Sequence, residues 1–246
     1  MSAPTGRHII DTENGPLAAV ADPGRVWRIG YAPEPWQWTP WQYTGALGIF
    51  DGRWDDPRGS FRTVYAGSTL LACLLEVLAP FRTDPHVADE LDAIDDDDEY
   101  PSTRPGLVPR TWLSKRRVSV AKLAGVYCAV TDRESLATIR TVFLSAALRL
   151  GLADIDGGAL RLSAPRGLTQ QVAAWLYDLH DGDRTVFDGI AFESRHGDGL
   201  PLWAIFERDD DPDTSRHLTN IQTDMLDGSH PDVVEAFRLH RLTWTS

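Results

Sequence analysis

The sequence predicts an α+β fold in which a mixed, mostly antiparallel sheet is flanked by helices. Strands and helices follow one another irregularly, so the strict alternation of a doubly wound fold is absent. The 246 residues suit one large domain or two small ones and can bury a substantial core. We predict a single domain over residues 25–246. A flexible arm over residues 1–24 precedes it, because that stretch is polar, rich in Gly and Pro, and without periodicity.

The composition argues against several classes of protein. A net charge of −12 and a pI near 4.9 disfavour direct binding to a nucleic-acid backbone as the main activity. Cys73 and Cys128 lie in apolar segments and indicate buried free thiols in a reducing compartment. No signal peptide is recognisable, and the longest apolar runs are shorter than a membrane span. We therefore expect a cytoplasmic protein without a membrane partner.

The first predicted strand covers residues 25–30, where charged and apolar side chains alternate. This pattern allows two interpretations of Arg28. Its side chain either points into a partly enclosed space or extends into solvent from an edge strand, and spacing alone slightly favours the second.

A Trp- and Pro-rich loop follows, with Trp36, Trp38 and Trp41. The three indoles would either stack on a sugar or a base or pack the loop onto the domain, and packing is favoured. Next comes Gly52-Arg53-Trp54, in which the glycine would let backbone and guanidinium approach an anion together. The same residues would also fit a turn whose arginine pairs with Asp51 or Asp55.

Residues 62–80 predict a strand followed by a helix. Thr63-Val64-Tyr65 has the β-branched and aromatic character of a strand, and Ser68 is the expected N-cap of the helix. Glu76 is the only charge in this otherwise apolar helix, so its carboxylate must be hydrogen-bonded, reach water or have a purpose. We expect Tyr65 and Glu76 to face one pocket.

The rest of the chain predicts a long acidic, solvated insertion over residues 84–109, and then further strands and helices. A capping box at Thr131–Glu134 opens a helix through Leu150, and Ser229 caps the last helix. The other expected elements are strands at 111–113, 117–120, 125–130, 188–195 and 201–206, and a helix at 167–180.

Recognisable motifs of metal and nucleotide chemistry are absent from the sequence. The histidines are scattered, and no cysteine pair has zinc spacing, so we expect no metal. There is no phosphate-binding Gly-Lys loop, no Gly-x-Gly-x-x-Gly and no Gly-x-Ser-x-Gly elbow. The remaining candidates are separated residues on or beside predicted elements: Arg28, Arg53, Tyr65, Glu76 and Ser194.

In this order, these residues resemble the RES-domain family, which is named for its Arg, Glu and Ser. Trp27-Arg28-Ile29 matches the opening strand of the family, and Gly52-Arg53-Trp54 matches its Gly-Arg-aromatic motif. Tyr65-Ala66 with Glu76 eleven residues after Tyr65 matches the strand and helix, and Gly189–Arg195 matches the late Gly-Ile strand ending on Ser194. The resemblance spans most of the chain. Asp55 stands where the family often has Asn, and the Trp-rich loop has no counterpart.

The resemblance implies a toxin of a bacterial toxin–antitoxin pair that degrades NAD⁺ as a phosphorylase or glycohydrolase. Inorganic phosphate would be the co-substrate of a phosphorylase. It also implies a fold related to diphtheria-toxin-like ADP-ribosyltransferases, and a helix-turn-helix antitoxin as protein partner. The alternatives are an ADP-ribosyltransferase that modifies a macromolecule and a non-catalytic module that binds ligand through Trp36, Trp38 and Trp41.

This chemistry gives each candidate a role. Cleavage of the nicotinamide–ribose bond passes through an oxocarbenium-like state, which Glu76 would stabilise beside the ribose. Tyr65 would stack on or orient that ribose, and Ser194 would hydrogen-bond the ribose or the nicotinamide. Arg28 and Arg53 would hold the pyrophosphate or the attacking phosphate, with Gly52 and Trp54 completing the Arg53 motif.

Overall fold

The computed structural model describes residues 6–82, 105–162 and 164–245. Most of the predicted acidic insertion and the first five residues of the predicted arm lie outside this part of the chain. Among the described residues, no helix combines the length and the apolar character needed to cross a membrane.

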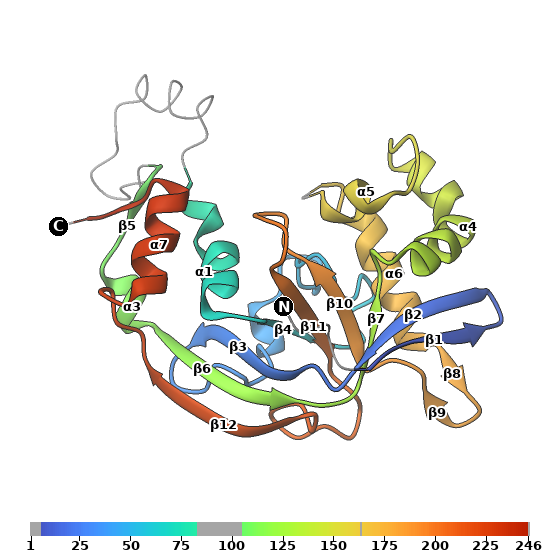
Figure 1. Ribbon diagram of the computed structural model, residues 1–246, viewed down its shortest axis with the longest axis horizontal. Coiled ribbons are helices and arrows are strands. Elements are labelled where there is room, and N and C mark those ends of the chain that lie inside the picture. Colours follow the sequence, from blue (N-terminus) through green and yellow to red (C-terminus); the bar gives the residue numbers. More distant parts are fainter. Residues whose placement is uncertain (1–5, 83–104, 163, 246) are drawn as a thin grey trace.

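A nine-stranded curled sheet forms the centre of the described structure (Figure 1). Its neighbouring strands are antiparallel except for one parallel pair, β7 with β10, which confirms the predicted mixed and mostly antiparallel sheet. In sheet order the strands are β1 (Arg7–Thr12), β2 (Gly15–Ala21), β7 (Val126–Ala129), β10 (Gly189–Glu193), β11 (Pro201–Phe206), β4 (Thr63–Gly67), β3 (Gly24–Tyr31), β6 (Arg116–Leu123) and β12 (Leu218–Met225).

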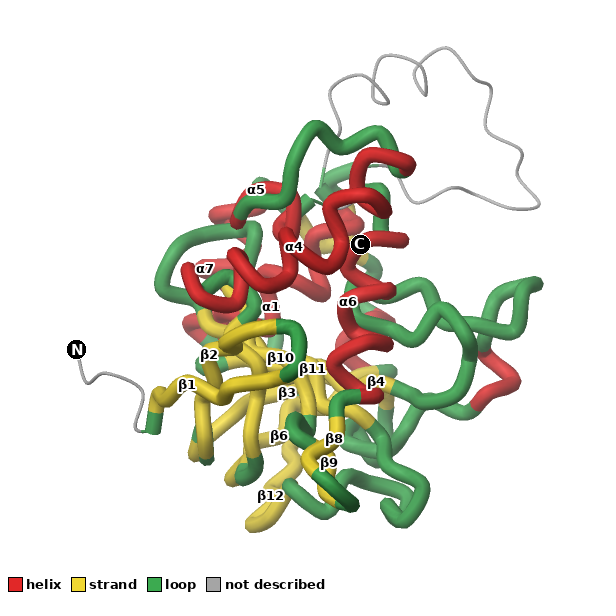
Figure 2. The backbone as a smooth tube through the Cα atoms, turned by 90° about the vertical axis from the view of Figure 1, so that its right-hand side faces the viewer, coloured by secondary structure: helices red, strands yellow, loops and turns green. Residues whose placement is uncertain are grey.

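The helices lie on one side of the sheet in two separate groups (Figure 1 and Figure 2). One group contains α1 (Leu70–Leu78), α3 (Thr111–Ser114) and α7 (Pro231–His240), and the other contains α4 (Arg133–Arg149), α5 (Gly157–Arg161) and α6 (Gly167–Asp178). Each group has its own apolar core against the sheet. Short elements complete the described structure: η1 (Trp41–Tyr43), η2 (Ala79–Phe81), and the pairs β5 (Leu107–Val108) with β13 (Thr243–Trp244) and β8 (His180–Asp181) with β9 (Arg184–Thr185).

Residues 7–21 differ from the loose arm that the sequence led us to expect. They form the hairpin β1–β2, and β2 continues into the main sheet by pairing with β7. The apolar run from Leu17 to Val20 is buried, and Ser135 Oγ accepts a hydrogen bond from the backbone N–H of Ala18. Burial of this short run against the sheet outweighs the Gly and Pro content on which the prediction of an arm rested.

Strand β3 is a central strand, which contradicts the edge-strand interpretation of Arg28. It pairs with β6 along its whole length, from Gly24 to Tyr31, but with β4 only where Trp27 faces Gly67. Beyond that point β3 and β4 diverge. The Arg28 side chain bridges the opening by donating from Nη1 to the Tyr65 carbonyl oxygen at 2.7 Å and from Nε to that of Pro35.

The Trp-rich loop packs on the sheet face opposite the helices. Trp36 and Trp38 are each only 2% exposed, and they donate indole hydrogen bonds to Ser119 Oγ at 2.8 Å and to the Pro212 carbonyl at 3.0 Å. Trp41 is 37% exposed. A stacking platform of all three indoles is therefore excluded, because two of the three rings are buried in the core.

Several predicted helix boundaries shift in the structure. The N-cap of α1 is Thr69 rather than Ser68, and the Thr69 hydroxyl accepts from the Ala72 N–H at 3.1 Å. Asp132 caps α4 in place of the predicted capping box, and His230 rather than Ser229 caps α7. The segment predicted as a strand at 111–113 is the short helix α3. A capping residue is selected by its side-chain geometry, which a local pattern of Ser, Thr and Asp does not determine.

Trp36 and Trp41 provide a direct test of this packing. We expect Trp36→Ala to lower the free energy of unfolding by about 3–5 kcal/mol, because it empties a buried indole site. Trp41→Ala should cost about 1 kcal/mol or less. Urea denaturation followed by circular dichroism measures both. Equal effects of the two substitutions would contradict the packing described above.

Candidate active site

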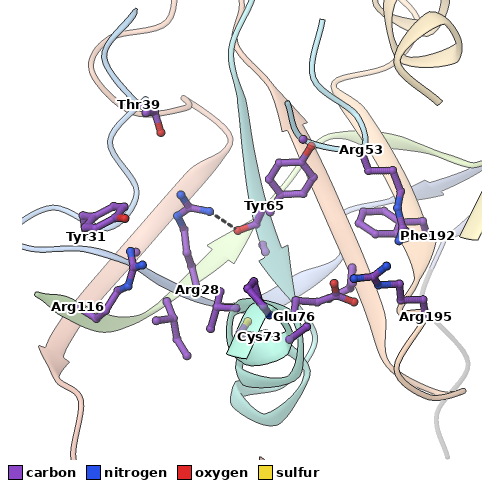
Figure 3. Close-up of a pocket in the computed structure, with 18 of the residues that line it drawn as sticks. Arg28, Tyr31, Thr39, Arg53, Tyr65, Cys73, Glu76, Arg116, Phe192 and Arg195 are labelled. Atoms are coloured by element: carbon purple, nitrogen blue, oxygen red, sulfur yellow. Dashed lines mark hydrogen bonds between the residues drawn. The ribbon is translucent and has the colours of Figure 1, made fainter. Parts of the chain in front are cut away.

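A pocket of about 400 Å³ lies beside β3 and β4, where the two strands diverge (Figure 3). Strand β4, helix α1 and the loop at 52–53 all contribute to its lining. Gly67 allows α1 to approach β4 closely, because a Cβ at this position would lie 2.7 Å from the Sγ of Cys73. This close approach brings the Glu76 side of α1 to the Tyr65 side of β4.

Glu76 is the only carboxylate among the described residues that line the pocket, and five arginines share the lining with it. Glu76 Oε1 accepts a hydrogen bond from Ser194 Oγ at 2.6 Å. The carboxylate therefore has one oriented oxygen, while its side chain remains 30% exposed to the pocket. An ionised group held in this way can stabilise a positive charge that develops on a bound compound.

The five arginines lie at two ends of the pocket. Arg28 and Arg116 are at one end, and Arg53, Arg166 and Arg195 are at the other. Figure 3 shows Arg28 and Arg53 on opposite sides of the Tyr65 ring. They therefore do not form a single clamp.

Burial affects both of these arginines. Desolvation lowers the pKa of Arg28 to about 10, and the nearby charge of Arg116 acts in the same direction. Burial also lowers the pKa of Arg53, against the raising effect of Glu76. Both guanidiniums nevertheless stay protonated near neutral pH. Neither has a carboxylate in salt-bridge contact among the described residues, so the pocket offers positive charge to an anion.

The Tyr65 hydroxyl belongs to the wall of the pocket, not to its open space. It donates to Asp55 Oδ1 at 2.9 Å and accepts from the Trp54 N–H at 2.9 Å. Asp55 Oδ2 also accepts from the Gly52 N–H at 2.5 Å. Asp55 therefore pairs with the backbone of its own loop and with Tyr65, not with Arg53. Its burial raises the pKa of the Asp55 carboxyl, in opposition to these hydrogen bonds.

Ser194 and His196 lie behind Glu76. Ser194 is 1% exposed, and its Oγ also accepts from the His196 N–H at 3.0 Å. The Ser194 hydroxyl is thus engaged by Glu76 and by the backbone of its own turn. It orients the Glu76 carboxylate and does not reach into the pocket. His196 Nε2 lies 3.8 Å from Glu76 Oε2. Burial lowers the pKa of His196 to about 4, so its imidazole is neutral near pH 7.

Of the residues singled out from the sequence, Arg28, Gly52, Arg53, Tyr65 and Glu76 line one pocket. Ser194 lies against it through Glu76. Trp54 does not line it: its ring is fully buried in the core and packs on Phe192 at 5.6 Å.

Sequence reasoning missed several other residues of the pocket, among them Tyr31, Arg116, Arg166, Phe192 and Arg195. Arg195 directly follows Ser194 in the late strand motif, so its position offered a signal. Arg116 offered none, because only the pairing of β3 with β6 brings it to the pocket.

The described residues contain no group of three or more His, Cys, Asp or Glu side chains that could hold a metal ion. Cys73 lines the pocket, but burial raises its thiol pKa to about 12. Its Sγ donates to the Trp27 carbonyl at 3.1 Å. This thiol is therefore protonated and unreactive at neutral pH.

The fold and the pocket together describe an α+β domain built around a strongly cationic site with one central carboxylate. Comparison with family models gives a match to the RES domain over residues 25–227, most of the chain. The chain therefore belongs to the RES family, as the sequence motifs indicated. Among curated proteins and among solved structures, no significant match was found.

The Asp55 carboxyl leads to a prediction about stability and pH. Its pKa is raised in the folded protein, so the folded state binds this proton more tightly than the unfolded chain does. The contribution of Asp55 to stability is therefore present below the ordinary aspartate pKa and is lost as pH rises through the raised value. The free energy of unfolding of the wild type should therefore fall as pH rises through this range, and we expect Asp55→Asn to remove the part of the fall that Asp55 causes.

Urea denaturation between about pH 4 and pH 8 measures the fall in both proteins. Asp198→Asn is the control, because the Asp198 side chain is 91% exposed and pairs with Arg161 at the surface, so the substitution should change the profile far less than Asp55→Asn does. Parallel profiles for the wild type and Asp55→Asn would contradict the raised pKa.

Proposed function

We propose that this protein is an NAD⁺-consuming enzyme that cleaves the nicotinamide–ribose bond, with phosphate or water as acceptor. The observation that carries the proposal is the placement of Glu76 as the only carboxylate among the described lining residues, between two cationic ends of one pocket. A dinucleotide brings a pyrophosphate for one end and a cationic nicotinamide ribose for the carboxylate. Membership of the RES family supports the same substrate.

The reaction needs no group beyond those in the pocket and the two substrates. The bond between ribose C1′ and the nicotinamide nitrogen breaks, and its electron pair leaves with neutral nicotinamide. The positive charge that remains is shared by C1′ and the ring oxygen, where the Glu76 carboxylate stabilises it. An oxygen of phosphate or water then bonds to C1′, and attack by water releases one proton to the solvent.

We propose supporting roles for further residues of the site, based on their contacts. Ser194 orients Glu76 through its 2.6 Å hydrogen bond and is a positioning residue. Tyr65 presents its ring to the ribose, since its hydroxyl is engaged by Asp55 and Trp54. Arg28 holds the pyrophosphate, and Arg53 with Arg195 binds the attacking phosphate.

Membership of the RES family supports a proposal about the physiological role. We propose that the protein acts in the cytoplasm as a toxin of a toxin–antitoxin pair, and that a helix-turn-helix antitoxin blocks this pocket. We also propose the relation of its fold to diphtheria-toxin-like ADP-ribosyltransferases. The sequence of a small neighbouring gene would test the partner.

Glu76→Gln tests the carboxylate. The substitution keeps the shape of the side chain and removes its charge, so we expect nicotinamide release from NAD⁺ to fall by roughly 100-fold or more. Chromatographic measurement of nicotinamide gives the rate. Glu235→Gln is the matched control, because Glu235 is a helical glutamate that pairs with Arg238 outside the pocket. No release by the folded wild-type protein, with or without phosphate, would overturn the proposed function.

The acceptor is tested by the same assay in buffers with and without inorganic phosphate. Phosphorolysis predicts a rate that rises with phosphate and a phosphorylated ADP-ribose product, whereas hydrolysis predicts free ADP-ribose in both buffers. Label from NAD⁺ that appears on a macromolecule would indicate an ADP-ribosyltransferase instead.

A growth experiment tests the catalytic role of Glu76 in cells. In a bacterial host, we expect expression of the wild type to slow growth and expression of Glu76→Gln not to do so. Equal growth defects would count against a catalytic Glu76.

A further inference from the structure

We propose that the end of the pocket formed by Tyr31 and Arg116 binds the adenosine diphosphate half of the substrate. The scissile bond then lies towards Arg53 and Arg195, at the other end. This orientation deepens the proposed function and rests on it, whereas the binding of an adenine nucleotide at Tyr31 and Arg116 does not depend on turnover.

The sheet places Tyr31 and Arg116 side by side. They face each other directly in the antiparallel pairing of β3 with β6, so their side chains project on the same face. The Arg116 guanidinium lies 3.7 Å from the centre of the Tyr31 ring and 5.6 Å from that of Trp112. Two aromatic rings thus hold this cation at the pocket wall.

Among the described residues, Arg116 has no side-chain hydrogen bond or ion pair to account for its position. Its Nε is buried without a hydrogen bond, and its contacts are with the rings of Tyr31 and Trp112. In a protein with a net charge of −12, an arginine held by rings alone, at the wall of a pocket, is available to an anionic ligand.

Arg28 provides the second positive charge at this end. Its Nε and Nη1 donate to the carbonyl oxygens of Pro35 and Tyr65, so these two groups are engaged by the protein. Nη2 has no hydrogen bond within the described part of the chain and remains for a ligand. Two neighbouring guanidiniums, each with donors to spare, suit a diphosphate better than a single phosphate.

Tyr31 supplies a surface for the base. The residue is 67% exposed although Arg116 covers part of its ring, so a large part of the phenol is open at the pocket edge. An exposed aromatic ring beside a phosphate-binding arginine is the arrangement in which a purine stacks. Adenine on Tyr31 and a diphosphate on Arg28 and Arg116 together describe ADP.

The opposite end lacks such a surface. Its aromatic residue, Phe192, is only 8% exposed, and the Arg53 guanidinium lies 5.8 Å from the centre of the ring. This end offers charge without an open ring, which suits a small anion beside the reacting carbon. The two ends therefore differ in a way that gives the dinucleotide one direction.

Titration calorimetry with ADP and with pyrophosphate tests the subsite without turnover. We expect ADP to bind the wild type more tightly than pyrophosphate does, and Tyr31→Ala to remove roughly 10-fold of this preference. Arg116→Ala should weaken both ligands by roughly 10-fold or more. Arg110→Ala is the matched control, because Arg110 stacks over Trp244 at 5.9 Å outside this pocket and should leave both affinities unchanged.

A kinetic comparison tests the orientation. Nicotinamide mononucleotide has the scissile bond and one phosphate but lacks the adenosine monophosphate half of NAD⁺. The ratio of kcat/KM for NAD⁺ to that for the mononucleotide should therefore fall by roughly 10-fold in Arg116→Ala and in Tyr31→Ala, and stay constant in Arg110→Ala.

Several results would overturn the inference: no binding of ADP to the wild type, equal binding of ADP to all variants, or a constant selectivity ratio. The outcome is separable from that of the proposed function. If ADP binding follows the expected pattern and NAD⁺ is not cleaved, the adenine-nucleotide subsite stands, and the orientation falls together with the proposed reaction.

Discussion

The pocket depends on one arginine that takes the place of a backbone ladder. Strands β3 and β4 pair only where Trp27 faces Gly67, and beyond this point the Arg28 side chain reaches the Tyr65 carbonyl that a continuous ladder would have occupied. A second hydrogen bond, to the Pro35 carbonyl, ties the Trp-rich loop to the same cation. Burying a charge without a carboxylate is costly, and the two carbonyl contacts offset part of that cost. An anionic ligand would offset the remainder, so the opening of the sheet also leaves a position where an anion would be favoured.

The charge of the whole protein and the charge of its pocket have opposite signs. A net charge of −12 predicts poor binding of anions in general, yet the described pocket lining has five arginines and one carboxylate. Close contacts in a site of low dielectric outweigh the distant and screened charges of the surface. The Glu76 carboxylate would add a preference for a ligand that carries positive charge as well as an anionic group, which the arginines alone would not provide.

The sequence predicted those parts of the site that depend on patterns of neighbouring residues along the chain. It missed the parts that depend on pairing between strands distant in the sequence. Arg28, Tyr65 and Glu76 lie on elements whose type could be inferred from hydrophobic patterns. Arg116 lies far from Arg28 in the sequence and joins it only through the register of β3 with β6. The same limit explains the hairpin at residues 7–21, whose apolar run gains its stability from pairing with β7. Ser194 was found by its motif, but its contact with Glu76 needed the tertiary approach of α1 to the turn that follows β10.

Tyr65 connects the two ends of the pocket in a way that its motif alone did not reveal. Its carbonyl oxygen accepts from Arg28, while its hydroxyl binds Asp55 and the Trp54 N–H, which fix the loop that bears Arg53. One residue therefore ties the arginines of both ends to strand β4. The ring between these contacts is rigid, so Tyr65 helps to set the spacing between Arg28 and the loop that bears Arg53. In the proposed reaction, the pyrophosphate of NAD⁺ and the separate attacking phosphate would lie on either side of the reacting carbon, and a fixed spacing would hold both anions while that carbon reaches Glu76. Under the proposed function, Tyr65 would therefore fix the distance between these two anions as well as present its ring to the ribose.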